Sequence, residues 1–207
     1  MSQILVFGGS IIYGAWDKEG GWVSRLRRFI DKKNLSDAED YYCLIYNLGV
    51  DGNTSENLLE RFEFETKQRL HEKESVFIFS IGANDALFDL SRKSHLVSLE
   101  KYEENIKKLI FLAKKFSSKI IFLGIAAVDE SKTMPVSWDD NLFYKNEYII
   151  KYNKILKSVC EENKVAFVEI SNVLTSIDLE DGLHPNSAGH QKIFEIVKEF
   201  LIENKII

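Results

Sequence analysis

Short apolar runs that alternate with longer segments of helical period are the feature that most restricts the fold of this chain. Each run has four to six residues rich in Ile, Val, Phe or Leu, so it suits a strand buried on both faces. We expect five such strands, at residues 4–7, 42–47, 76–81, 120–124 and 166–170. Strands that alternate with helices form a parallel sheet covered by helices on both faces. The sequence therefore predicts an α/β fold with a five-stranded parallel sheet.

Apolar residues that recur at steps of three or four predict the helices between these strands. One such stripe runs from Tyr102 to Phe116, and Ser98 stands where it can cap the helix. Two further stripes run over residues 148–159 and 193–201. Because these aromatic and aliphatic side chains have the spacing of a core, we interpret them as packing residues and not as a ligand site.

Nothing along the chain marks a domain boundary, since it has no internal repeat, no low-complexity tract and no linker rich in Pro, Gly or Ser. A length of 207 residues suits one α/β core, so we expect a single domain over residues 1–207. The least regular stretch is 126–141, where Pro135 and Trp138 interrupt the pattern after the fourth strand. A long loop at the carboxyl end of a strand is typical of a lid or a pocket wall.

The charge balance limits the classes of partner. The chain has 27 Lys and Arg against 32 Asp and Glu, a net charge of −5, and no basic block longer than a pair. Nucleic acids and anionic membranes require a basic face, so we expect neither as a partner. No window approaches the length of about 18 uninterrupted apolar residues that a transmembrane helix needs, and residues 1–7 lack the basic start of a signal peptide. We therefore expect no membrane span and a cytoplasmic location, and the oligomeric state stays open.

The two cysteines, Cys43 and Cys160, lie far apart and form neither a CxxC unit nor a disulfide framework. We expect them to be buried free thiols, which fits a reducing compartment.

Open α/β sheets bind their ligands beyond the carboxyl ends of the strands, so the residues that follow each strand are the first candidates for a site. Four strand ends are followed by side chains able to do chemistry. The four segments are Gly8-Gly9-Ser10, Gly49-Val50-Asp51-Gly52-Asn53-Thr54, Gly82-Ala83-Asn84-Asp85 and Asp181-Gly182-Leu183-His184-Pro185-Asn186. A nucleophile, amides, carboxylates and an imidazole are thus expected at one edge of the sheet.

Phosphate-binding and metal-binding patterns fail at these ends. A dinucleotide fingerprint requires glycine where Ser10 stands, and a Walker loop requires lysine where Ala15 stands. Asp181, His184 and His190 have no Cys partner and form no helical HxxxH pair. We therefore expect neither a phosphate loop nor a metal site.

The combination suits acyl transfer instead. A serine hydroxyl needs an imidazole to accept its proton and a carboxylate to orient that imidazole. Ser10, His184 and Asp181 can fill these roles, because Asp and His three residues apart in a loop can meet side chain to side chain. An oxyanion also needs fixed donors, and the loss of one costs about 100 to 1000 fold in rate. We expect these donors to be the backbone N–H groups of Ser10 and Gly52 and the side-chain amide of Asn84.

These segments resemble, in order, the four motif blocks of the SGNH hydrolases, also called the GDSL lipase/esterase superfamily. The matching stretches are Val6-Phe7-Gly8-Gly9-Ser10, Asn47 to Thr54, Gly82-Ala83-Asn84-Asp85, and Asp181 to Asn186 with Gly189-His190 downstream. The resemblance runs from residue 4 to about residue 200. It puts the nucleophile on Ser10 and the oxyanion roles on Gly52 and Asn84.

The resemblance implies a flavodoxin-like, three-layer α/β/α fold, no cofactor, and esterase, lipase, thioesterase or carbohydrate deacetylase activity. One position departs from the family pattern, because Gly9 stands where the family has Asp before the nucleophile. We interpret this as altered support for the turn with the chemistry retained, and glycine tolerates the strained φ that such turns often require.

We therefore predict a serine esterase that hydrolyses a small-molecule carboxylic ester through an acyl-enzyme on Ser10, with His184 as base and Asp181 as its orienter. Activity should rise as the imidazole loses its proton, which for an ordinary histidine occurs at about pH 6.5. The acyl group stays open between acetyl on a sugar and longer chains on a lipid or thioester. Residues 134, 138 and 142–144 suit either an apolar pocket or a loop packed on the domain. The alternatives are a non-catalytic binding module with this fold and a flavodoxin-like nucleotide binder.

The other histidines have no assigned chemistry. We expect His190 to be packed or hydrogen-bonded behind the site. His71 and His95 have charged or polar neighbours in the sequence, so we expect them on the surface.

Overall fold

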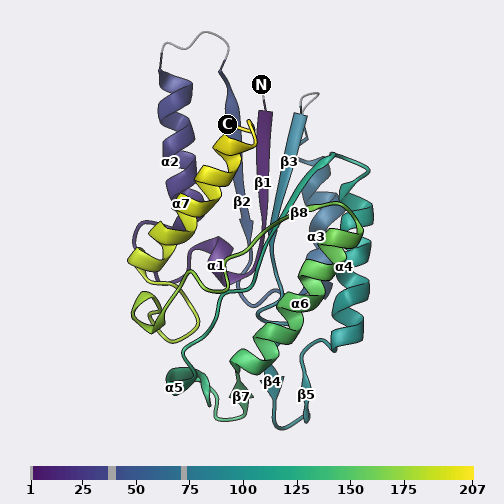
Figure 1. The fold of residues 1–207 in the computed structure, drawn as a ribbon, viewed down its shortest axis with the longest axis vertical. Helices are drawn as coiled ribbons and strands as arrows, with labels where there is room; N and C mark the ends of the chain where they lie inside the picture. The colour runs from purple at the N-terminus through teal and green to yellow at the C-terminus, as the bar shows by residue number, and fades with distance from the viewer. Residues whose placement is uncertain (1, 37–40, 71–73) are drawn as a thin grey trace.

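The computed structural model describes residues 2–36, 41–70 and 74–207. At its centre is a five-stranded parallel sheet in the order β2-β1-β3-β6-β8 (Figure 1). The strands are β1 (Ser2–Gly8), β2 (Cys43–Gly49), β3 (Glu74–Ser80), β6 (Lys119–Leu123) and β8 (Ala166–Val168). All five expected strands are confirmed, and no boundary differs from its predicted position by more than two residues.

Helices cover both faces of the sheet, as the alternating pattern predicts (Figure 1). The long helices are α2 (Gly21–Leu35), α3 (Ser55–Lys67), α4 (Leu99–Ala113), α6 (Asn146–Glu162) and α7 (Ser187–Glu203). The cap expected at Ser98 is present, because its side chain accepts a hydrogen bond from Lys101 N at 3.2 Å. Helices α2 and α7 pack on one face, and α3, α4 and α6 pack on the other.

The core has two halves because successive residues of a strand point to opposite faces. In β1, Leu5 and Phe7 join the half under α3, α4 and α6, whereas Ile4 and Val6 join the half under α2 and α7. All four side chains are fully buried. Burial of such a side chain contributes about 1.5–3 kcal/mol, so β1 is held firmly between the two helical layers.

A small antiparallel sheet lies beyond the carboxyl ends of the parallel strands and was not predicted. Its order is β5-β4-β7, with strands β4 (Phe88–Asp89), β5 (Ser94–His95) and β7 (Leu142–Phe143). Strands of two residues are too short to show an alternating pattern, so the sequence carries no periodic signal for them. The irregular stretch 126–141 contains the short helix α5 (Glu130–Thr133) and leads into β7.

The strand order creates a crevice next to β1. From β1 the chain runs through α1 (Ser10–Tyr13) and α2 to the neighbouring strand β2, whereas from β3 it runs through α4 to β6 on the other side of the sheet. The connections after β1 and β3 therefore diverge, and such a switch point is where open α/β sheets bind their ligands. Ser10 follows β1 and Asn84 follows β3, so both lie at this crevice.

Candidate active site

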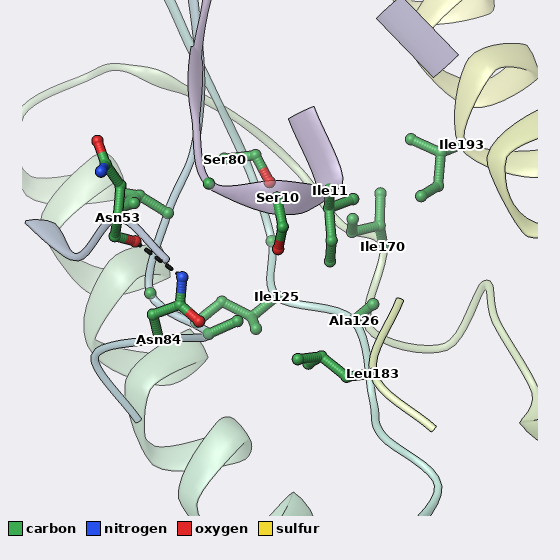
Figure 2. A pocket seen from close by; sticks show the side chains of 15 residues that line it. Ser10, Ile11, Asn53, Ser80, Asn84, Ile125, Ala126, Ile170, Leu183 and Ile193 are labelled. Carbon is green, nitrogen blue, oxygen red and sulfur yellow. Dashed lines mark hydrogen bonds between the residues drawn. The ribbon is translucent and has the colours of Figure 1, made fainter. Parts of the chain in front are cut away.

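Ser10 lies at the turn from β1 into α1 and is 6% exposed. Figure 2 shows its Oγ pointing into a cavity at the end of the sheet. The preceding Gly9 has a φ of −94°, outside the left-handed region that favours glycine. The expectation that a strained φ explains glycine at this position is therefore wrong. A Cβ at Gly9 would instead stand 3.2 Å from Nδ2 of Asn84.

Asp181 and His184 lie in the loop between the 3-10 helix η1 (Ser176–Asp178) and α7. This loop brings His184 across to the end of β1, where its Nε2 lies 2.9 Å from Oγ of Ser10. On the other side of the ring, Nδ1 lies 2.7 Å from Oδ2 of Asp181. The three side chains chosen from the sequence thus form one hydrogen-bonded chain.

The carboxylate decides which nitrogen of His184 carries the proton. An unprotonated Nδ1 would repel a carboxylate oxygen at 2.7 Å, so the proton lies on Nδ1 and Nε2 is left to accept from the Ser10 hydroxyl. Burial acts to raise the pKa of Asp181, but hydrogen bonds from the side chain and backbone of His184 and from Leu183 N outweigh it. The pKa of this carboxyl is therefore held well below its usual range, and Asp181 is ionised at neutral pH.

Asn84 follows β3, and two hydrogen bonds set the orientation of its amide. The Tyr144 hydroxyl donates to Oδ1 at 2.9 Å, and Nδ2 donates to the Asn53 carbonyl at 3.0 Å. An amide group has two N–H donors, so one remains for a ligand in the cavity. Asn84 and Ser10 both line that cavity (Figure 2).

Gly52 lies in the turn after β2 and lines a depression together with Ser10 and Asn84. Its φ is +70°, a left-handed conformation that a residue with a Cβ rarely adopts. No atom lies within 4 Å of a Cβ built at this position. The backbone conformation, and not a lack of space, is thus the reason for glycine here.

Asp85 anchors the two turns to each other. It is fully buried and accepts hydrogen bonds from the backbone N–H and the hydroxyl of Ser55, the first residue of α3. Asn105 of α4 donates in turn to the Ser55 hydroxyl at 2.8 Å. Burial raises the pKa of Asp85 to about 6, and the hydrogen bonds from Ser55 act against that rise. This cluster holds the start of α3, and so the turn that carries Gly52, against the residue next to Asn84.

Two cavities meet at Ser10, and Asn84 and Leu183 line both. The smaller has a volume of about 40 Å³ (Figure 2). Its apolar lining comes from Ile11, Ile81, Ala83, Ile125, Ala126, Ile170, Leu183 and Ile193. The larger is an open depression of about 350 Å³, lined in part by Trp138 and Tyr144. Stretch 126–141 therefore supplies a pocket wall through Trp138, whereas Leu142 and Phe143 form β7.

Trp16 is a residue of this site that sequence reasoning missed. Its Nε1–H donates to Oδ2 of Asp181 at 2.9 Å, and its ring packs edge-to-face against His184 with centroids 5.7 Å apart. A contact between side chains 165 residues apart leaves no spacing signal in the sequence. The only available indication was an aromatic residue in the loop that follows Ser10 and α1.

The expectations for the remaining histidines had different outcomes. His190 is fully buried and its Nδ1 accepts from Trp22 N at 3.3 Å, as expected, and burial lowers its pKa to about 4. The surface position expected for His95 is wrong, because its ring packs among Phe88, Tyr148 and Tyr152 and its Nδ1 lies 3.0 Å from the Ala86 carbonyl. Its polar sequence neighbours gave no sign of this aromatic cluster. His71 lies outside the described residues.

Cys43 and Cys160 are both free and buried, as expected. Within residues 2–36, 41–70 and 74–207, no three or more His, Cys, Asp or Glu side chains are grouped to hold a metal ion. No helix in the same ranges is long and apolar enough to cross a membrane.

Comparison with known proteins identifies the family. The model of the GDSL-like lipase/acylhydrolase family matches residues 6–192. The chain belongs to this family. The match covers all four segments that carry the site, from Ser10 to His184.

Individual relatives agree with this assignment. A multidomain esterase of Ruminococcus flavefaciens is 26% identical over 226 aligned residues, which cover 92% of this chain but only 27% of that protein. The chain thus spans about a quarter of the length of this relative. Among solved structures, a lipase/acylhydrolase from Enterococcus faecalis has a TM-score of 0.72 at 22% identity, over 97% of this chain and 95% of its own. An acetylxylan esterase from Geobacillus stearothermophilus has a TM-score of 0.69 at 20% identity, over 97% and 93%. These two structures share the fold.

Proposed function

We propose that this member of the GDSL-like lipase/acylhydrolase family hydrolyses short-chain carboxylic esters with Ser10 as nucleophile. The observation that carries the proposal is the hydrogen-bonded chain from Ser10 Oγ through His184 to Asp181, with distances of 2.9 and 2.7 Å. Family membership and the esterase name of the Ruminococcus flavefaciens relative support the reaction class.

In the first half of the reaction, Ser10 Oγ attacks the ester carbonyl carbon while His184 Nε2 takes the hydroxyl proton. Asp181 stays ionised and stabilises the imidazolium that forms. The negative oxygen of the tetrahedral intermediate accepts hydrogen bonds from the N–H groups of Ser10 and Gly52 and from Nδ2 of Asn84. Collapse of the intermediate breaks the ester bond, and His184 gives its proton to the departing alcohol.

In the second half, water replaces the alcohol. His184 takes a proton from that water, which attacks the carbonyl carbon of the acyl-enzyme on Ser10. The second tetrahedral intermediate uses the same oxyanion donors. Its collapse releases the carboxylic acid, and the proton on His184 returns to Ser10 Oγ.

The size of the smaller cavity supports a short acyl group. Its volume of about 40 Å³ is small beside the 350 Å³ or so of the neighbouring depression. We propose that this smaller cavity holds an acetyl or similarly short acyl group. The apolar lining suits the methyl end.

The larger depression suits the alcohol part of the ester. Trp16 and Trp138 line it with rings that are largely exposed, and Asp51 adds a carboxylate. Exposed aromatic faces together with polar groups bind sugar rings well, so we propose acetylated carbohydrates as the substrate class. The acetylxylan esterase from Geobacillus stearothermophilus has a similar fold.

Reaction with a fluorophosphonate probe tests the nucleophile, because only an activated serine is labelled. We expect the wild-type protein to be labelled at neutral pH and Ser10→Ala not to be labelled. We also expect p-nitrophenyl acetate to be hydrolysed by the wild type and not by this variant. Full turnover by Ser10→Ala would refute the proposed nucleophile, and an unlabelled, inactive wild type would indicate a non-catalytic binding module.

A series of p-nitrophenyl esters tests the acyl group. We expect kcat/KM to fall by at least about tenfold from acetate to octanoate, because each methylene that lacks space costs on the order of tenfold. Equal or rising kcat/KM along the series would contradict a short-acyl site. Release of acetate from an acetylated xylooligosaccharide, compared with hydrolysis of a triacylglycerol, tests the alcohol part.

A further inference from the structure

Trp16 makes an unusual set of contacts for a large aromatic residue. It is 65% exposed, so its ring is not part of the core. Its φ is +65°, a left-handed conformation that is uncommon for any residue other than glycine. Its indole N–H nevertheless points inward and donates to Oδ2 of Asp181 at 2.9 Å. Core packing does not explain these properties together, because a side chain that is 65% exposed buries little apolar area.

The carboxylate of Asp181 is held by four donors that divide between its two oxygens. Oδ1 accepts from the backbone N–H groups of Leu183 and His184 at 3.0 and 2.8 Å. Oδ2 accepts from His184 Nδ1 at 2.7 Å and from Trp16 Nε1 at 2.9 Å. The Trp16 Nε1 also lies 3.0 Å from His184 Nδ1, but that nitrogen carries a proton and does not accept.

Without the indole, water would take its place at Oδ2. The torsion that rotates a carboxylate is broad and is set by its hydrogen bonds. The side chain of Asp181 is 21% exposed, and the indole ring packs edge-to-face against the imidazole of His184 beside it. Water in that position would screen the contact and would leave Oδ2 free to turn away from the imidazole.

The residue next to Trp16 holds this loop in place independently of the indole. The buried carboxylate of Asp17 accepts from the backbone N–H groups of Glu19 and Gly21 and pairs with the buried guanidinium of Arg25. Arg25 also donates to the hydroxyl of Ser187 at 2.8 Å at the start of α7. The backbone that presents Trp16 is thus fixed against α2 and α7, so a change of the Trp16 side chain leaves the loop anchored.

We infer that Trp16 is a positioning residue, whose indole N–H holds the Asp181 carboxylate in the orientation that accepts the proton of His184 Nδ1. The inference rests on the proposed function. It predicts that the N–H group matters for turnover, whereas the area of the ring does not. A lost hydrogen bond to a charged group that is partly exposed corresponds to about a tenfold loss of rate.

The test is steady-state hydrolysis of p-nitrophenyl acetate by Trp16→Phe, which keeps an aromatic ring and removes the donor. We expect kcat to fall about tenfold and KM to change less than about twofold. Tyr13→Phe is the control, because it removes an exposed hydroxyl donor from α1, beside the loop of Trp16; Tyr13 lines neither cavity at Ser10, and its hydroxyl makes no hydrogen bond within the described residues. Its kcat should stay within about twofold of the wild type.

A double-variant comparison separates positioning from a general structural effect. If Trp16 acts through Asp181, Trp16→Phe should change kcat less than about twofold in an Asp181→Ala background. A replacement of Trp16 by 3-benzothienylalanine, which exchanges only the N–H for sulfur, should show the same loss as Trp16→Phe. This second variant keeps the shape of the side chain, so a loss caused by altered packing would be absent from it.

Each outcome decides one question. A wild-type protein that does not hydrolyse the ester refutes the proposed function itself. With an active wild type, the inference is overturned by an unchanged kcat in either Trp16 variant, by an equal loss in the Asp181→Ala background, or by a loss that lies in KM alone.

Discussion

Two fully buried groups, His190 and Asp85, should make the stability of this protein respond to pH in opposite directions. Burial lowers the pKa of His190 from an ordinary value of 6.5 to about 4. Burial raises the pKa of Asp85 from 3.8 to about 6. Each difference between folded and unfolded pKa values converts into free energy of unfolding at about 1.4 kcal/mol per pKa unit.

The two signs follow from which state binds the proton. Between pH 6.5 and 4 the unfolded chain protonates His190 and the folded chain does not, so acidification over this range removes about 3 kcal/mol of stability. Between pH 6 and 3.8 the folded chain protonates Asp85 and the unfolded chain does not, so acidification adds about 3 kcal/mol. The two contributions nearly cancel in the wild-type protein.

Asp85→Asn removes the pH-dependent contribution of Asp85 to stability. The asparagine keeps an oxygen that accepts from the Ser55 N–H. We expect the free energy of unfolding of this variant, relative to the wild type, to fall by about 3 kcal/mol from pH 6.5 to pH 4. His190→Gln should show the opposite trend, a rise of about 3 kcal/mol over the same range. The difference from the wild type at each pH cancels the contributions of all other titrating groups.

Urea denaturation followed by tryptophan fluorescence, at constant ionic strength and at several pH values from 4 to 6.5, measures these differences. A difference that does not change with pH for Asp85→Asn would show that this carboxyl does not hold a raised pKa in the fold. If the free energy of unfolding relative to the wild type changed in the same direction with pH in both variants, the opposite contributions assigned to Asp85 and His190 would be refuted.

Three further predictions concern the proposed oxyanion donor Asn84, its partner Tyr144, and the ion pair that anchors the Trp16 loop. Asn84→Ala should lower kcat by about 100 fold or more with an unchanged free energy of unfolding, and a loss accounted for by unfolding would not support the role. Tyr144→Phe removes the donor to Asn84 Oδ1, so we expect a smaller loss in kcat, about fivefold, measured with p-nitrophenyl acetate; a loss as large as that of Asn84→Ala would contradict a purely orienting contact. Arg25→Gln leaves the buried Asp17 carboxylate unpaired and should lower the free energy of unfolding by about 3 kcal/mol or more in urea denaturation, whereas an unchanged stability would show that the pair contributes nothing.

Much of the candidate site was predictable because it follows the ends of strands. Ser10, Gly52 and Asn84 each follow a parallel strand, and the carboxyl ends of parallel strands lie at one edge of the sheet. Once the strand pattern was known, their proximity needed no further information. The predicted reason for glycine at Gly9 was wrong because a backbone angle depends on how the turn packs, which the sequence pattern does not contain.

The parts of the site that could not be predicted depend on side chains far apart in the chain. Trp16 reaches Asp181 across 165 residues, and Tyr144 reaches Asn84 across 60. The aromatic neighbours of His95 come from β4 and α6, and the residues that precede it in the sequence are polar or charged. No periodic or local rule reports such contacts.

The sequence by itself determined the five strands, their covering helices and the order of the four motif segments, because apolar period and capping act between near neighbours in the chain. Only the tertiary structure decided which proton His184 carries, how small the cavity beside Ser10 is, and that an exposed indole holds the Asp181 carboxylate. Those properties depend on distances between side chains from different elements, and these distances exist only after the helices and loops have packed against the sheet.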